Sequence, residues 1–532
     1  MSRLLLVTLV ASLAAVASAP TAHAQQAAAP VTISLDEAMQ IAAQRSYVLQ
    51  TSALDVENAD AQVSEAWGQL FPQVDASASY TRNLKQANPF AGSSAGDIFG
   101  GLGAIDWLAF NEGARTDDDP NTEPIALGEF FDRQQQGLDD AGIVVDEDAN
   151  PFAVDNQFQG AITVTQTLYS GSAFAAVRGA QSLKDFNQAA YETQLQDVLH
   201  QTREAFYGAL LAQQQVEVLV ASVARTAETV EETERRVAQG VMPKFERLTA
   251  EVELANLETQ LIQAESQAAF ASDNLLLTLG LPVEEDIRLR GALDLPGDAL
   301  FQSVALADAV ETAMERRPDL DQARLGVRLR QVDKGITRSQ YFPTVEANAT
   351  FAYVGNVPDN RDFTTQPDQS DPFLFESGTE DFFSDAYWQP NVAVGLSLRW
   401  NLFNGLQTTR RMQQRQIAID QAEIALAQAT QGARLEVAQA LRDLRSAQQR
   451  IAAQDQNVQR AETAYTFAEA RLANGVATPL QVRDASNALD QSRLAYLQAV
   501  HDLLIARSTL ERATGTLRLD GDPDPASEFT MR

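Results

Sequence analysis

The chain has 532 residues, a formal net charge of −32 and no cysteine. Such acidity argues against a nucleic-acid partner. Disulfides are excluded, and the three histidines (His23, His200 and His501) lie too far apart in sequence for a His/Cys metal cluster within one subunit. The composition therefore favours a protein that is not an enzyme and needs no metal or cofactor.

Residues 1–24 have the pattern of a secretory signal peptide. Arg3 gives a short basic start, Leu4–Val16 an apolar core, and Ala22-His23-Ala24 a small-x-small cleavage site. The apolar run is too short to span a bilayer, and no later stretch reaches the roughly 18 consecutive apolar residues of a membrane-spanning helix. We expect a secreted chain that begins at Gln25 and has no transmembrane helix.

The remaining chain is an internal duplication. Residues 35–80 align without a gap with residues 306–351, which gives a displacement of 271 residues. Further downstream, residues 236–241 match residues 471–476 and Gly280 matches Gly515. The period is too long for a solenoid, so the units are large halves. We divide the chain into four parts: signal peptide 1–24, first repeat 25–302, second repeat 303–515 and flexible C-terminal tail 516–532.

Each repeat opens with a helical pattern that a proline ends. Ser34 and Glu37 have the spacing of a capping box, and residues 35–70 then follow a helical period until Pro72. Pro343 occupies the matching position in the second repeat. We expect both prolines to mark the start of a strand.

Beyond each proline the period changes from helical to two. Apolar and polar residues alternate in four stretches, namely 74–80, 157–169, 345–353 and 392–402. Each stretch is about ten residues long with one apolar and one polar face, which suits a tilted membrane-spanning strand. A strand of a soluble sandwich would show the same alternation.

Long insertions separate the two strands of each repeat, at residues 83–156 and 355–389. Both are acidic, with runs at 117–119 and 146–148. They connect strand ends away from the helices, so we expect them to face the cell exterior. Neither acidic run has the spacing of an EF-hand loop, which favours a solvated acidic surface over a cation site.

Two proline-free stretches, Ser172–Val241 and Leu406–Leu472, predict helices on the order of 100 Å long. Apolar residues recur in them every seven residues, at positions 216, 223, 230 and 237 and at positions 437, 444, 451, 458, 465 and 472. That period specifies left-handed coiled packing. An ordinary two-stranded coiled coil is the alternative.

Glycines break both long helices. Gly240 and Gly475 follow the periodic stretches, and the helical pattern resumes at Lys244–Leu279 and Pro479–Thr514. We therefore expect two long helical hairpins with turns at these glycines.

The strand count predicts an oligomer. Four strands per chain are too few to close a barrel, and a bilayer does not tolerate the edges that they leave. Three chains would supply twelve strands. The expected fold is mainly α with a β-barrel portion: a trimeric 12-stranded outer-membrane β-barrel, with the long hairpins forming a tube below the membrane.

In this order, and duplicated, the motifs resemble the outer-membrane efflux protein family, the TolC-like channels, over nearly all of the mature chain. The motifs that carry the resemblance are Phe71-Pro72, Phe342-Pro343, Leu402-Phe403-Asn404-Gly405, and the breaks at residues 236–241 and 471–476. The resemblance implies a homotrimer in the outer membrane of a Gram-negative bacterium, with a long periplasmic α-helical coiled-coil barrel. It further implies a passive export duct of a tripartite efflux or type I secretion system. Its partners would be outer-membrane lipid, a periplasmic adaptor (membrane fusion protein) and an inner-membrane transporter.

The resemblance also implies a pore aperture just beyond the hairpin turns, ringed by acidic residues. Asp484 and Glu246 stand at the matching positions, and Gln481 stands where a relative has a second acid. Leu472 and Ala477 occupy the places of a tyrosine and arginine latch, which this chain lacks. Alternatively, Asp484 and Glu246 are helix-start acids favoured by the helix dipole.

Two other functions compete with an export duct. One is a cell-surface structural or adhesive coiled-coil protein without transport activity. The other is a secreted hydrolase, for which the sequence offers no supported catalytic triad or metal set. A Walker-type motif is also missing from the sequence, so energy for export would come from a partner. Drugs, metal ions, polypeptides and polysaccharides all remain open as cargo.

Overall fold

The structure, a computed structural model, describes residues 31–85, 95–116, 123–143, 154–293, 304–368 and 371–519. The predicted signal peptide and both acidic runs lie outside these ranges. The chain forms two compact units. The first comprises residues 1–59, 183–327 and 421–532, and the second comprises residues 60–182 and 328–420.

The helical stretch at the start of each repeat is two helices, where one had been predicted. The first repeat has α1 (Leu35–Arg45) and α2 (Tyr47–Gly68), and the second has α7 (Leu306–Arg316) and α8 (Pro318–Ser339). In the second repeat the break follows from Pro318, because the residue before a proline avoids the helical region. In the first repeat Ser46 takes an extended ψ of 126° at the same place.

The capping box of α1 is confirmed. The Ser34 and Glu37 backbone and side chains bond reciprocally, and the Glu37 carboxylate accepts from the Ser34 N–H at 2.7 Å. These hydrogen bonds lower the pKa of Glu37.

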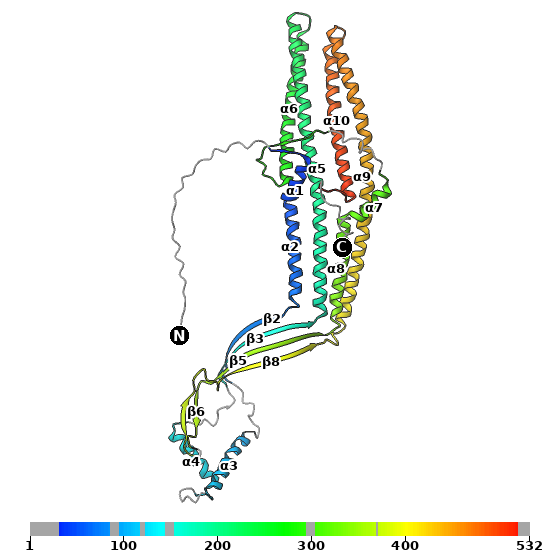
Figure 1. Cartoon of the computed structure of the whole chain (residues 1–532). Coiled ribbons are helices and arrows are strands. Elements are labelled where there is room, and N and C mark those ends of the chain that lie inside the picture. The colour runs from blue at the N-terminus through cyan, green and yellow to red at the C-terminus, as the bar shows by residue number, and fades with distance from the viewer. Residues whose placement is uncertain are drawn as a thin grey trace, which may run out of the picture. The chain divides into compact units, whose positions relative to one another are not determined.

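Four strands form one antiparallel sheet in the order β2-β3-β5-β8 (Figure 1). Their bounds are β2 Gln73–Arg82, β3 Asn156–Tyr169, β5 Thr344–Val357 and β8 Trp388–Arg399. The four predicted strands are confirmed, although β8 ends three residues before Leu402. Since β2 and β8 each pair with only one strand, the sheet of a single chain has two open edges.

The register places apolar residues of all four strands on one face. Ala76 lies opposite Ile162, Ile162 opposite Phe351, and Phe351 opposite Val392. The opposite face carries rows such as Asp75, Thr163 and Thr350. On the apolar face, Val394 is 82% and Leu396 75% exposed. A single chain therefore leaves a large apolar sheet surface uncovered.

The two insertions fold together into a small module. The first provides α3 (Ala95–Gly113) and α4 (Leu127–Asp140), and the second a hairpin of β6 (Asp362–Thr365) and β7 (Glu376–Thr379). Phe130 of α4 is fully buried, with its ring 5.3 Å from that of Phe373 from the second insertion. The sequence analysis did not predict this shared packing, because aromatic side chains spread over long polar stretches show no period.

Two long helical hairpins confirm the predicted breaks (Figure 1). One consists of α5 (Gly171–Ala238) and α6 (Lys244–Leu279), and the other of α9 (Gln407–Ala473) and α10 (Pro479–Ala513). A short parallel pair, β1 (Val31–Ile33) and β4 (Ile287–Leu289), completes the first unit. No helix of the described ranges is long and apolar enough to cross a membrane.

The main core of the first unit joins both repeats. It gathers buried side chains from α1, α2, α5, α6, α9 and α10, among them Leu49, Phe206, Leu275, Ile451 and Leu503. The predicted flexible tail, residues 516–532, is packed near its start. Leu517 is 1% exposed and packs with Met39 and Leu199. Residues 520–532 lie outside the described ranges.

The two repeats share a glycine contact that fixes where each hairpin ends. Gly280 and Gly515 end α6 and α10 with φ of 69° and 71°. An added Cβ would lie 2.4 Å from the carbonyl oxygen of Arg45 at Gly280, and 2.6 Å from that of Arg316 at Gly515. Only glycine suits both the left-handed backbone and this close approach.

We expect Gly515→Ala to lower the free energy of unfolding by about 1–3 kcal/mol, because the new methyl group meets both penalties. The matched control is Gly432→Ala inside α9, where an added Cβ meets nothing within 4 Å. That control should be neutral or stabilising by up to about 1 kcal/mol. Thermal unfolding of the purified proteins measures both changes, and equal stability of the two variants would contradict the prediction.

Candidate functional site

The turns of both hairpins have the same geometry. Gly240 and Gly475 adopt φ of 77° and 73°. At the first turn the N–H of Gly240 donates to the carbonyl of Val237, and the N–H of Val241 donates to the carbonyl of Arg236. The matching residues of the second turn form the same two hydrogen bonds. This is the Schellman motif, in which two otherwise unpaired carbonyls at a helix end are satisfied. The structure places both predicted turn glycines at the hairpin turns, in the left-handed conformation.

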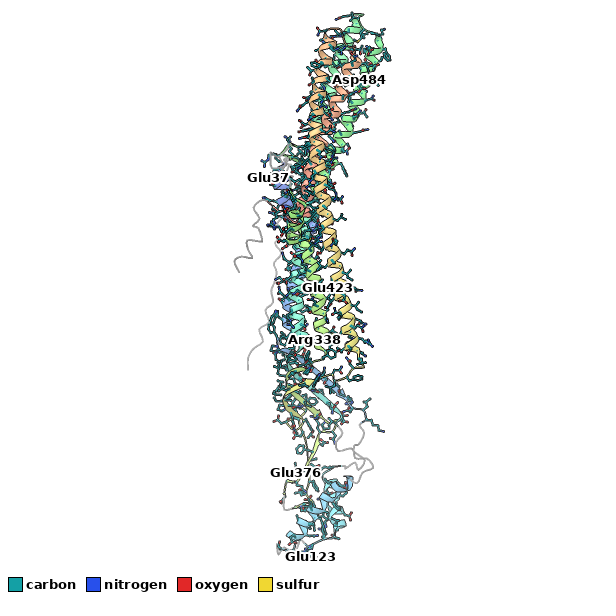
Figure 2. The ribbon with its side chains drawn as sticks, turned by 90° about the vertical axis from the view of Figure 1, so that its right-hand side faces the viewer. Glu37, Glu123, Arg338, Glu376, Glu423 and Asp484 are labelled. Atoms are coloured by element: carbon teal, nitrogen blue, oxygen red, sulfur yellow. The ribbon has the colours of Figure 1, made fainter. Side chains whose placement is uncertain are left out.

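Asp484 lies close to the turn of the second hairpin (Figure 2). It is the sixth residue of α10, and its side chain is 65% exposed. The nearest cation is the guanidinium of Arg483, 3.9 Å from the carboxylate. Because Asp484 lies beyond the first helical turn, the helix dipole gives it little stabilisation, which weakens the alternative of a helix-start acid.

Gln481 has a capping function that the sequence analysis had not assigned. It is the third residue of α10, and its side-chain carbonyl accepts from the backbone N–H of Thr478 at 3.3 Å. The amide of Gln481 therefore stabilises the start of α10. An acidic residue at the same place could cap in the same way, so the local fold does not depend on the missing charge.

Glu246 lies in the first turn of α6 and faces the other hairpin. It lines a cavity of about 50 Å³ between the two hairpins, together with Arg483 at the start of α10. The remaining lining is mostly hydroxyl and amide side chains, including Thr229, Thr249 and Asn487. The structure thus brings Glu246 close to the start of α10, whereas Asp484 points to the exposed surface.

A buried ion pair joins the two hairpins near this cavity. The Asp490 carboxylate on α10 accepts a hydrogen bond from the Ser222 hydroxyl at 2.6 Å and forms an ion pair with Arg225; both partners lie on α5. The Asp490 side chain is 10% exposed and the Arg225 side chain 22%. Asn487 adds a second link, since its amide donates to Glu253 of α6 at 3.4 Å.

Sequence reasoning missed this cross-hairpin pair. Asp490 directly follows the buried residue Leu489, so a carboxylate beside the apolar stripe of α10 was the one available signal. Its partner lies 265 residues away in the other repeat, and no spacing rule connects them.

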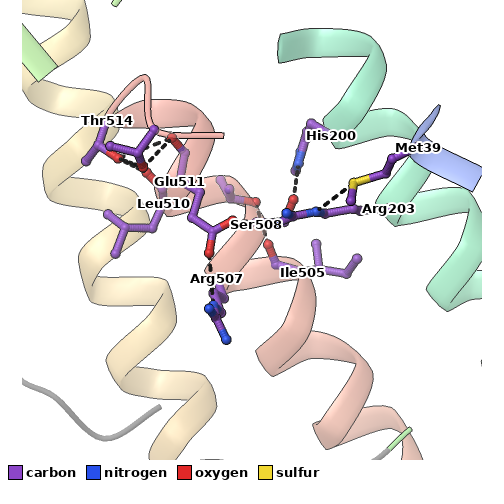
Figure 3. A network of polar contacts seen from close by, with 11 residues as sticks. Met39, His200, Arg203, Ile505, Arg507, Ser508, Leu510, Glu511 and Thr514 are labelled. Carbon is purple, nitrogen blue, oxygen red and sulfur yellow. Dashed lines mark hydrogen bonds and ion pairs between the residues drawn. The ribbon is translucent and has the colours of Figure 1, made fainter. Parts of the chain in front are cut away.

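A second network joins α5 to α10 farther from the turns (Figure 3). The imidazole Nδ1 of His200 lies 2.9 Å from the Ser508 hydroxyl, and Arg203 pairs with Glu511. Burial lowers the pKa of His200 and outweighs the opposing carboxylate of Glu204, 3.2 Å away. Neutral His200 can accept from Ser508 while it donates to Glu204, so both ring nitrogens are satisfied.

The two predicted strand starts also share one geometry. Pro72 and Pro343 directly precede β2 and β5. The phenylalanine before each proline donates a backbone hydrogen bond to the end of the preceding helix. The N–H of Phe71 donates to the carbonyl of Gly68, and that of Phe342 donates to the carbonyl of Ser339. Both phenylalanines are about half exposed or more, at 61% and 49%.

Apolar side chains are exposed at both hairpin turns. Val241 and Phe245 are each 71% exposed, and on the second hairpin Val476 is 67% and Leu480 47% exposed. Among the described residues, no group of three or more ligating side chains could hold a metal ion. The turn region is therefore a surface with exposed apolar tips, and the buried ion pair of Arg225 and Asp490 joins the two hairpins behind it.

Comparison with known proteins places this architecture in one family. The sequence model of the family described as "Outer membrane efflux protein" matches residues 132–281 and 309–516. Two relatives are the protein CyaE of Bordetella pertussis, 26% identical over 54% of this chain, and the alkaline protease secretion protein AprF of Pseudomonas aeruginosa, 22% identical over 68%. The alignments cover 56% of the CyaE length and 70% of the AprF length, so the chain matches little more than half of the former.

Solved structures show the same fold at low identity. The CmeC outer membrane channel of Campylobacter jejuni superposes with a TM-score of 0.66 at 13% identity, covering 93% of this chain and 88% of that one. The outer membrane protein VceC of Vibrio cholerae gives 0.65 at 17% identity, covering 90% and 96%. The predicted fold class, long helical hairpins combined with four strands per chain, is that of these channels.

We expect Asp490→Asn to lower the free energy of unfolding by about 3–5 kcal/mol, because it leaves the Arg225 guanidinium buried without a carboxylate. The matched control is Glu462→Gln, which breaks a more exposed ion pair with Arg493 inside the second hairpin. That control should cost about 1 kcal/mol or less. Chemical denaturation of both variants tests the difference, and a cost for Asp490→Asn as small as the control's would show that the cross-hairpin pair contributes little.

Proposed function

This chain belongs to the outer membrane efflux protein family, and from that premise we propose that it is the outer-membrane subunit of a tripartite efflux or type I secretion system. It would act as a passive duct in a Gram-negative bacterium. The observation that carries the proposal is the sheet, whose four strands present one continuous apolar face and two unpaired edges. A surface-adhesive coiled coil or a hydrolase would need no such sheet.

Aromatic rows at both ends of the strands support an outer-membrane location. At the insertion end, Tyr80 stacks on Phe158 at 4.8 Å and Phe158 on Trp388 at 5.5 Å. At the other end Trp400 is 54% and Phe403 76% exposed. Trp388 begins β8 and Trp400 directly follows it, twelve residues apart, which is about 40 Å along an extended strand and about 30 Å when the strand tilts by about 40°. That height matches the hydrocarbon core of a bilayer.

Two features support a homotrimer. Three four-stranded sheets joined at the β2 and β8 edges would close a twelve-stranded barrel and leave no free edge. The helix α6 also carries an exposed apolar stripe, which consists of Phe245, Leu248, Val252, Ile262, Phe270 and Leu277. An adjacent copy would cover this stripe, as a monomer leaves it in water.

The hairpin turns are the proposed docking surface for the periplasmic adaptor, through which an inner-membrane transporter would supply the energy. Val241 and Val476 occupy equivalent positions after the two turn glycines, so a trimer would present six similar apolar tips. Such a repeated surface suits an adaptor that binds in several copies.

We propose that the ion pair of Arg225 and Asp490 holds the channel closed at rest. Leu472 and Ala477 occupy the positions of the tyrosine and arginine latch, so this chain cannot form that latch. Closing would bring three copies of Asp484 around one axis at the aperture, with Glu246 behind them at the hairpin cavity. Gln481 would support the ring indirectly, through its cap on α10.

We predict that Leu398→Asp impairs assembly in the outer membrane far more than Ser397→Asp. Leu398 lies on the apolar face and is 65% exposed, so its replacement would put a carboxylate against lipid. Ser397 lies opposite Glu346 on the polar face, where a new carboxylate stays hydrated. Heat-modifiable trimer in outer-membrane fractions measures assembly, and equal yields of the two variants would mean that the faces are assigned wrongly.

We predict that Asp484→Ala lowers the cation preference of the channel in planar bilayers and weakens its block by multivalent cations, while the trimer persists. Three converging carboxylates attract cations and oppose anions at neutral pH. Glu246→Ala should have the same effect less strongly, since that side chain faces the cavity between hairpins. The control is Asp455→Ala on α9, which also removes one negative charge. Unchanged selectivity in Asp484→Ala would remove that residue from the aperture.

A further inference from the structure

Four exposed arginines gather where the helices of the second unit adjoin the strands. Arg338 lies next to the last residue of α8, and its place near the strands is visible in Figure 2. Arg410, Arg411 and Arg415 lie in the first nine residues of α9. All four side chains are exposed, in a chain whose net charge is −32.

Local contacts hold this arginine cluster together without neutralising it. The Arg411 guanidinium donates to the Gln340 side chain at 3.3 Å, which ties the start of α9 to the end of α8. Arg410 donates to Gln413 at 3.1 Å. Gln340 and Gln413 are uncharged, and within the described part of the chain no carboxylate forms an ion pair with any of the four arginines.

The fold does not require these charges. When residues 168–171 (Leu-Tyr-Ser-Gly) are aligned with residues 402–405 (Leu-Phe-Asn-Gly), the first repeat has Ala176, Val177 and Gln181 where α9 has its three arginines, and its helix forms equally well. In the first turn of α9 the helix dipole moreover disfavours the positive charge of Arg410. The stability of α9 therefore does not explain the presence of the arginine cluster.

Exposed apolar side chains adjoin the cluster. Leu402 is 78% and Phe403 76% exposed in the segment between β8 and α9, and Leu406 is 58% exposed. Leu406 also has a φ of 66°, a left-handed conformation that is costly for a branched apolar residue. A strained, apolar turn beside guanidinium groups is the composition of a membrane-interface anchor.

The depth of the cluster fits lipid headgroups. The helix α8 ends five residues before β5 begins, and Arg415 lies eight residues into α9, about 12 Å along the helix. If the strands span the hydrocarbon core, the guanidinium groups reach the headgroup layer on the helix side. There their planar forks match phosphate oxygens.

We propose that Arg338, Arg410, Arg411 and Arg415 form a binding site for the phosphate headgroups of anionic phospholipids in the periplasmic leaflet of the outer membrane. The site rests on the proposed function, because the strands must lie in that membrane. It would recognise phosphatidylglycerol or cardiolipin over zwitterionic lipid, and its affinity would fall as salt increases.

The test uses the purified full chain in neutral detergent, titrated with phosphatidylglycerol or phosphatidylcholine and followed by native mass spectrometry and thermal unfolding. For wild type we expect bound phosphatidylglycerol and a raised Tm, with no effect of phosphatidylcholine. The combined variant Arg410→Gln, Arg411→Gln and Arg415→Gln should bind phosphatidylglycerol at least about tenfold more weakly. Replacing the same three residues by lysine should restore most of the binding.

The matched control changes three exposed arginines farther along the same helix, Arg434→Gln, Arg442→Gln and Arg460→Gln, and should bind lipid like wild type. Equal binding by the cluster variant and wild type, or equal losses in both triple variants, would overturn the proposal. So would binding of soluble peptidoglycan fragments, but not phosphatidylglycerol, through the cluster. Lipid binding is measured in detergent, so a negative result there would contradict the lipid site alone. The proposed function is tested separately, by the effect of Leu398→Asp on membrane assembly.

Discussion

Backbone hydrogen bonding in lipid is the constraint on which the rest of this structure depends. Each unpaired N–H or C=O group costs several kcal/mol in hydrocarbon, so the open edges of β2 and β8 cannot remain there. Pairing with further copies removes the edges and also turns the uncovered face of Val394 and Leu396 toward lipid, where exposure is favourable. The same assembly would cover the apolar stripe of α6. The proposed trimer thus satisfies both requirements without disulfides, which a chain without cysteine cannot form.

Duplication explains how one chain supplies such regular parts, and it also shows where the halves have diverged. Gly280 and Gly515 end equivalent helices against equivalent carbonyl groups. The break between the two helices that open each repeat is stabilised differently in the two halves. In the first, Ser46 is buried as a small polar cap, whereas in the second the Arg317 guanidinium bonds Asp319 and Glu436, each at 2.7 Å. Positions that differ between repeats in this way carry information about function, because the matching position shows what the fold alone requires.

Local rules predicted the elements well. Period two located all four strands, period seven located the long helices, and Gly240 and Gly475 gave their turns. The prediction was wrong at Ser46, where a helix breaks without proline or glycine, so that only tertiary packing decides. The site was less accessible: the motif resemblance identified Asp484, Gln481 and Glu246 as candidates, but the cap made by Gln481 and the pair of Arg225 with Asp490 depend on contacts in three dimensions. Alternation along a strand likewise cannot reveal that distant insertions share a core.

The shared aromatic core of the insertions has an evolutionary consequence. Phe130 comes from one repeat and Phe373 from the other, and Gly137 leaves the space that the backbone carbonyl of Phe373 occupies. Shortening either loop alone would strip the other of its packing and expose fully buried aromatic surface. Length variation among descendants of this chain should therefore be correlated, with both insertions retained or both reduced together. Because the module is built from two separate segments of the chain, recombination of a single continuous segment cannot exchange it.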